Sequence, residues 1–243
     1  MNRTEPQSYQ DFESLPARVA GVFRRPRALF KTVIDRPRWA DIVILTLAAM
    51  LACGVALMET AVGRQALVDQ WERTATAFGR DLDDAEYARL QELSESGPAY
   101  AALNAVALGP ALAFGLAGAV YVVFTGVLGG RGSYRQNLAV VAHAGVILGL
   151  RQVVAAPFAY ARETLASPLT LTPFFPMLDE ASPAARFFGV IDLFVVWWLV
   201  VVAIGVALLY GRPMRRTAVA FVGAYVGVAA LLAIAMVLTG GTV

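Results

Sequence analysis

The sequence predicts an all-α fold: a polytopic membrane protein with a bundle of five transmembrane helices and an N-terminal amphipathic interfacial helix. Three observations support this prediction. Hydrophobic residues make up 58% of the 243 residues, which exceeds the usual share in a soluble domain. Charged residues make up only 16%, and most of them lie in residues 1–40 and 59–98. Long stretches elsewhere carry almost no charge, which is typical of segments that face lipid.

The N-terminal part of the chain is polar at first and then basic and amphipathic. We expect a disordered tail over residues 1–14 and an amphipathic helix over residues 15–38, broken or kinked at Pro26. The apolar side of this helix includes Val22, Leu29 and Phe30, and most of its other residues are basic. We therefore expect it to lie on anionic lipid headgroups, with contacts from Arg24, Arg25, Arg27, Lys31, Arg36, Arg38 and Trp39. An ordinary solvated helix is the alternative.

Residues 39–243 form the predicted membrane domain. Its five apolar segments are each close to the roughly 20 residues that cross a hydrocarbon core. Only helices suit them, because lipid-exposed backbone must satisfy its own hydrogen bonds and the segments lack the alternation of barrel strands. The predicted spans are residues 39–58, 103–128, 138–160, 187–210 and 217–238.

The charges between the spans predict the orientation. Basic residues precede the first span and occur in the second and fourth connections, whereas the outer loop 59–98 is acidic. We therefore expect a cytoplasmic N-terminus and a periplasmic C-terminus in a bacterial cytoplasmic (inner) membrane. The bacterial assignment comes from composition, since Lys31 is the only lysine and alanine, valine and glycine are plentiful. Within the loop we expect a helix near residues 83–93, and the sequence leaves open whether the loop folds independently.

Two charged residues inside the spans are the strongest candidates for a functional site, because such residues are costly in lipid. Arg151 lies roughly 21 Å from the inner face at about 1.5 Å per residue. Asp192 lies roughly 8 Å from the outer face of a core about 30 Å thick. The depths nearly coincide, so we predict that the two side chains pair. The pair fits either a clamp that fixes helix packing or a gate or substrate contact.

Other polar or small residues in the spans predict packing. His143 is the only histidine, which excludes a multi-histidine metal site and leaves an interhelical hydrogen bond or a pH switch. Asn104 fits a polar contact between helices or a helix cap. Glycines and alanines recur every fourth residue near Gly115 and at Gly223 and Gly227, a pattern that favours close packing within one subunit over a dimer seam.

No motif predicts catalysis or cofactor binding. The acidic run of residues 81–92 has Glu86 where a calcium loop needs glycine. The segment GGRGS at residues 129–133 lacks the end of a phosphate-binding loop and is interpreted as a turn. Cys53 is the only cysteine, so it has no intrachain disulfide partner. We therefore expect no enzyme activity, no metal site and no cofactor, and we expect no nucleic-acid partner because the basic residues adjoin apolar spans.

Several stretches together resemble the Yip family, the five-span Ypt/Rab-interacting membrane proteins, in their bacterial form. They are RPRALF at residues 25–30, RPRW at 36–39, GGRGSY at 129–134 and IDLF at 191–194, followed by Trp197 and Gly205. The resemblance covers residues 20 to about 232, and it implies a five-helix bundle with a cytoplasmic N-terminus. Eukaryotic members are associated with vesicle trafficking and small GTPases. The family offers no catalytic residue to transfer to this chain.

Two functions from different classes follow from these observations. The first is a non-enzymatic membrane scaffold or assembly and trafficking protein, which binds anionic lipids and a membrane-protein partner or a second copy of itself. The alternative is a small transporter, channel or lipid-moving protein that uses Arg151 and Asp192.

Overall fold

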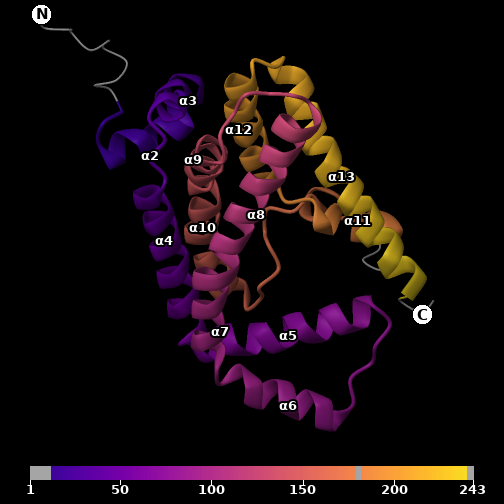
Figure 1. The fold of residues 1–243 in the computed structure, drawn as a ribbon. Helices are drawn as coiled ribbons and strands as arrows, with labels where there is room; N and C mark the ends of the chain where they lie inside the picture. The colour runs from indigo at the N-terminus through magenta and orange to yellow at the C-terminus, as the bar shows by residue number, and fades with distance from the viewer. Residues whose placement is uncertain (1–11, 179–181, 240–243) are drawn as a thin grey trace, which may run out of the picture. The chain divides into compact units, whose positions relative to one another are not determined.

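The computed structural model describes residues 12–178 and 182–239, and the regular secondary structure of these residues is helical apart from one isolated bridge between Thr170 and Asp192. The predicted tail over residues 1–14 therefore lies mostly outside the described residues. Figure 1 shows the arrangement of the helices. The α-helices are α2 (Leu15–Arg24), α3 (Pro26–Asp35), α4 (Ala40–Met58), α5 (Ala61–Ala77), α6 (Asp84–Ser94), α7 (Gly97–Leu103), α8 (Gly109–Tyr121), α9 (Tyr134–Ala144), α10 (Val146–Arg162), α11 (Pro183–Val190), α12 (Leu193–Tyr210) and α13 (Met214–Thr239). The shorter elements are the π-helical turns η1 (Asn104–Leu108) and η2 (Val122–Val127) and the 3-10 turn η3 (Thr172–Phe174).

Among the described residues, five helical stretches are long and apolar enough to cross a membrane, which confirms the predicted fold class. They have 18 to 31 residues, against the roughly 20 that a bilayer core requires. Large apolar side chains on them are exposed, such as Leu112 at 72% and Leu231 at 68%. So much exposed apolar surface suits lipid and would be unfavourable in water. The stretches are Ala40–Met58, Gly97–Val127, Tyr134–Arg162, Leu193–Tyr210 and Met214–Thr239.

Three of these stretches begin earlier than the hydropathy pattern indicates, because their first turns are made from capping residues and polar residues. The second begins at Gly97, with Pro98 in its first turn, where proline costs no hydrogen bond. The third begins at Tyr134, after a capping box in which Ser133 Oγ accepts from the Gln136 N–H at 3.2 Å. The fifth begins at Met214, directly after a proline.

The fourth predicted span, residues 187–210, is wrong as a single helix. The structure has two helices there, α11 and α12, and Ile191 and Asp192 lie between them. Ile191 has an extended conformation, with φ −85° and ψ 104°. Helix α11 also begins at Pro183, before the predicted start of this span at residue 187.

The chain divides into two compact units. Unit 1 contains residues 12–48, 107–149 and 197–222. Its core includes Leu29, Phe30, Val140 and Val202, all fully buried. Helices α2 and α3 pack on α9 (Figure 1). On α12, a Cβ at Gly205 would clash with Val140 and lie 3.2 Å from a ring atom of Phe30, so the α12 backbone closely approaches these side chains.

The amphipathic segment of residues 15–38 has the break that the sequence predicts at Pro26, because α2 ends at Arg24 and Pro26 starts α3. The packing of the two helices corrects the expectation for their apolar side, which an interfacial helix turns toward lipid. The apolar sides of α2 and α3, with Val22, Leu29 and Phe30, are buried in protein and do not face lipid. The physical reason is that α9 and α12 offer these side chains a close-packed partner.

The glycine-rich turn of residues 129–133 also has a packing role in unit 1. A Cβ at Gly132 would lie 2.7 Å from the Tyr210 ring, so glycine is needed for the turn to approach that ring. The Tyr210 hydroxyl accepts from Asn137 Nδ2 at 2.8 Å and lies 3.0 Å from Thr125 Oγ1. These contacts join α9, η2 and the end of α12, which agrees with the interpretation of the segment as a turn.

Unit 2 contains residues 49–106, 150–178, 182–196 and 223–239. It includes a cluster of buried residues, Leu57, Met58, Leu67 and Ala159, against which Trp71, Ala101 and Leu165 pack. The acidic loop 59–98 contains two helices, α5 and α6, which pack on each other (Figure 1). The predicted helix near 83–93 corresponds to α6, and its cap explains part of the acidic run, since Asp83 Oδ1 accepts from the Glu86 N–H at 2.7 Å. Helix α5 was not predicted.

The prediction that the small-residue ridges pack within one subunit is not supported by their surroundings. A Cβ built on Gly115, Gly223 or Gly227 would meet no atom within 4 Å among the described residues. Each of these glycines therefore faces open space in its own unit.

Candidate functional site

Asp192 of unit 2 begins helix α12 as its N-terminal cap. Its Oδ1 accepts hydrogen bonds from the N–H groups of Phe194 at 2.8 Å and Val195 at 3.4 Å. These N–H groups have no partner inside the helix, so the carboxylate satisfies them and also complements the positive end of the helix dipole. The signal was present in the sequence, because aspartate directly before a long apolar run is typical of a helix start.

The second carboxylate oxygen of Asp192 joins two other segments of unit 2. It accepts from Arg151 Nε of α10 at 2.8 Å and from Ser167 Oγ at 2.8 Å. The Asp192 side chain is 7% exposed and that of Arg151 is 31% exposed. The structure therefore brings together the two residues that the depth argument paired. It also adds Ser167, which no pattern in the sequence indicated.

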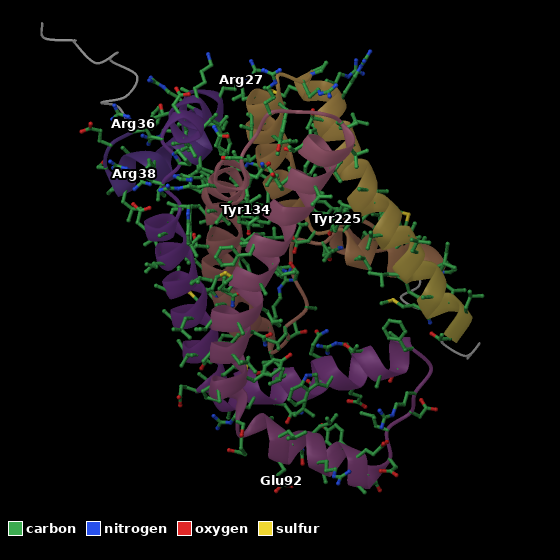
Figure 2. The ribbon with its side chains drawn as sticks, in the orientation of Figure 1. Arg27, Arg36, Arg38, Glu92, Tyr134 and Tyr225 are labelled. Atoms are coloured by element: carbon green, nitrogen blue, oxygen red, sulfur yellow. The ribbon has the colours of Figure 1, made fainter. Side chains whose placement is uncertain are left out.

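The backbone around Asp192 is irregular, and its hydrogen bonds are supplied by neighbours. The Leu193 N–H donates to the Leu169 carbonyl at 2.9 Å. The Tyr225 hydroxyl of α13 donates to the Val190 carbonyl at 2.7 Å and accepts from the Asp192 N–H at 3.0 Å (Figure 2). Non-helical backbone at a membrane span is tolerated only when protein satisfies it in this way. Tyr225 was missed by sequence reasoning, although a hydroxyl within an apolar span could have indicated it.

Asp192 and Arg151 form an ion pair, with 2.8 Å between Arg151 Nε and the carboxylate. The hydrogen bonds of Asp192 connect α10, the segment after it and α12.

Two cavities of unit 2 adjoin each other at Arg151. A cleft of about 720 Å³ is lined by Arg151 and Asp192 and by residues of α5, α11 and α13. A second cavity, of about 280 Å³, is lined mainly by apolar residues and also by Arg151 and Asn104. Two of the sequence-predicted polar residues, Arg151 and Asn104, therefore line one cavity.

His143 lies in unit 1, in a different cluster from Arg151 and Asp192. It is fully buried, its Nδ1 lies 2.8 Å from the Ala139 carbonyl, and its Nε2 lies 3.5 Å from Arg18 Nη1. Arg18 is only 5% exposed and forms an ion pair with Asp41. Sequence reasoning missed both Arg18 and Asp41, because Arg18 belongs to a basic helix in which every other cation is exposed.

The residues predicted to contact lipid headgroups are part of unit 1. Arg24, Arg25, Arg27, Lys31, Arg36 and Arg38 are all exposed, and Figure 2 labels Arg27, Arg36 and Arg38. Trp39 is half-buried and packs edge-on against Phe114, with ring centroids 5.6 Å apart.

Contacts within unit 1 bring the basic segments together. Arg27 Nη2 of α3 lies 3.1 Å from Met214 Sδ, at the turn between α12 and α13. Arg212 of that turn donates to the Leu128 carbonyl, beside the turn before α9, at 3.1 Å. The three basic segments that the charge pattern assigned to one side of the membrane are thus in contact. Within the described ranges, no group of three or more histidine, cysteine, aspartate or glutamate residues could hold a metal ion.

Comparison with known protein families identifies the Yip1 domain in this chain. The model of the Yip1 domain matches residues 20–237, which is most of the chain. Searches of curated proteins and of solved structures found no match.

Proposed function

Because the chain belongs to the Yip1 family and has five helices that can cross a membrane, we propose that it is a non-enzymatic scaffold of the bacterial cytoplasmic membrane. Its N-terminus lies in the cytoplasm in this proposal, and its basic surface gathers anionic lipid headgroups. We define the basic surface as the exposed cations of unit 1, which are Arg24, Arg25, Arg27, Lys31, Arg36, Arg38, Arg131, Arg135, Arg212, Arg215 and Arg216.

The observation that carries the proposal is the joining of three separate basic segments in unit 1. In the described part of this unit only Glu13, Asp35 and Asp41 are acidic, and Asp41 is engaged by buried Arg18. The basic surface therefore has a strong net positive charge. A juxtamembrane surface of this kind attracts anionic lipids by about 1 kcal/mol for each cation near the headgroups.

The acidic loop 59–98, with its helices α5 and α6, has a complementary role in this proposal. It forms the connection between the first and second spans, which the charge pattern assigns to the outer side of the membrane. We assign it to contact with a membrane-protein partner or with a second copy of the chain.

Neutralising two cations of the basic surface should reduce the anionic lipid around the protein. The variant is Arg24→Gln with Lys31→Gln, both exposed, in nanodiscs of phosphatidylethanolamine and phosphatidylglycerol. We expect its affinity for phosphatidylglycerol to fall by about 2 kcal/mol at low salt, and by less at high salt because salt screens exposed charges. Native mass spectrometry of the retained lipids measures the change.

A matched control removes two cations from unit 2. Arg80→Gln with Arg89→Gln has the same charge change, and both residues are exposed on or near α6. Arg80 pairs with Glu86 at the surface, where an ion pair contributes little stability. An equal loss of phosphatidylglycerol in this control would contradict the role of the basic surface.

Cysteine labelling tests the orientation. In a Cys53→Ser background, Glu92→Cys on α6 and Arg215→Cys near the start of α13 each give one exposed thiol. A maleimide that cannot cross membranes should label Glu92→Cys in spheroplasts, and Arg215→Cys only after permeabilisation. Labelling of Arg215→Cys in sealed spheroplasts would rule out the proposed orientation.

A further inference from the structure

The cleft of unit 2 that contains the ion pair is strongly basic. Four arginines line it, Arg73 of α5, Arg151 and Arg162 of α10, and Arg186 of α11. Asp192 is the only acidic residue among the described residues of its lining. The volume, about 720 Å³, lies within the range of roughly 300–1,000 Å³ that small-molecule sites occupy.

Among the described residues, three of the four arginines have no carboxylate of their own. Asp192 is occupied by Arg151 at 2.8 Å. Arg73 donates to Thr164 Oγ1 at 3.3 Å, and Arg186 donates to the Met236 carbonyl. Across residues 12–178 and 182–239, no carboxylate lies within 4.0 Å of Arg73, Arg162 or Arg186. Uncompensated like charges around one cleft attract an anion, and the planar guanidinium suits phosphate oxygens in particular.

An apolar cavity adjoins the basic cleft. The two cavities share Arg151 and residues 165–168 in their linings, so they meet at Arg151. The cavity, about 280 Å³, is lined by side chains such as Met50, Leu57, Leu67 and Ala155. A charged compartment connected to an apolar one matches a ligand with an anionic head and a hydrocarbon chain, and it does not match a free anion.

We propose that unit 2 binds one anionic phospholipid. Arg73 and Arg162 hold the phosphate in the cleft, together with Arg186, and an acyl chain enters the apolar cavity. Arg151 stands where head and chain meet, and Asp192 fixes its position. The proposal concerns unit 2 alone and goes beyond the scaffold function, because it specifies a single tight site where the basic surface of unit 1 gathers many lipids weakly.

Native mass spectrometry of the purified full chain in detergent can test this site by titration with phosphatidylglycerol. We expect one phosphatidylglycerol molecule to stay bound at lipid concentrations at which the other lipid molecules have dissociated from the protein. The variant Arg73→Gln with Arg162→Gln changes two exposed side chains and leaves the Asp192 contacts intact. It should bind this lipid at least about tenfold more weakly, since a hydrogen bond to a charged group contributes roughly 1.5–3 kcal/mol.

Controls separate the lipid from its parts and this site from the basic surface. Two double variants change cations outside the cleft and should bind the tight lipid with unchanged affinity. They are Arg80→Gln with Arg89→Gln, and Arg24→Gln with Lys31→Gln. Ala155→Phe, which fills the apolar cavity, should weaken the binding of phosphatidylglycerol. It should leave any binding of inorganic phosphate unchanged. Equal weakening in the Arg80/Arg89 control would overturn the proposal. The proposal would also be overturned if zwitterionic phosphatidylcholine, or inorganic phosphate, bound as tightly as phosphatidylglycerol.

Discussion

Replacing Asp192 by alanine is expected to lower the free energy of unfolding by about 3 kcal/mol, one of the two largest effects that we predict. The change leaves Arg151 with no carboxylate in a partly buried site, and it removes the cap of α12, which contributes about 1 kcal/mol by itself. The break between α11 and α12 also loses its connection to Ser167. Unfolding in mixed micelles with increasing sodium dodecyl sulfate measures the change.

Two further variants separate the cap from the ion pair. Asp192→Asn retains an oxygen that can cap α12 but loses the charge, so it should destabilise less than alanine. Arg151→Ala combined with Asp192→Ala should be more stable than the sum of the single effects predicts, because the double variant has no unpaired charge. Single effects that add to within about 0.5 kcal/mol would show that the two residues do not act as a pair.

Replacing Phe30 by alanine is the second large change, with an expected loss of about 3–5 kcal/mol. Phe30 is 0% exposed, and it lies against the Gly205 backbone of α12 in the core of unit 1. The alanine would leave a cavity that neighbouring helices cannot fill without moving. The same micelle unfolding experiment measures this loss.

The result distinguishes a helix packed in protein from one that lies in lipid. If the apolar side of α3 faced lipid, Phe30→Ala would weaken membrane association and leave the unfolding free energy nearly unchanged. Leu112→Ala is the matched control, because Leu112 of α8 is 72% exposed. This substitution should lower the free energy of unfolding by less than about 0.5 kcal/mol. Equal effects of the two substitutions would contradict the packing of α3.

The candidate site was partly predictable from the sequence. The number of residues between Arg151, Asp192 and the ends of their spans placed the two at similar depths, because a helix has a fixed rise per residue. The same counting could not find Ser167 or Tyr225. Ser167 lies in an irregular segment, and Tyr225 reaches the break through a contact between α13 and the end of α11, so neither has a local signature. The arginine-lined cleft likewise joins Arg73, Arg162 and Arg186 from separate elements.

The sequence by itself determined that five helices cross a membrane and which connections are basic, since the length of an apolar run and the positions of its charges are local properties. Only the tertiary structure decided what each apolar side contacts. Lipid tails and protein interiors are equally apolar, so the pattern that buries Phe30 against α9 and α12 is the same pattern that would place it in lipid. The break at Ile191 and Asp192 was decided in the same way, because hydrogen bonds from residues distant in the chain replace those that a continuous helix would make.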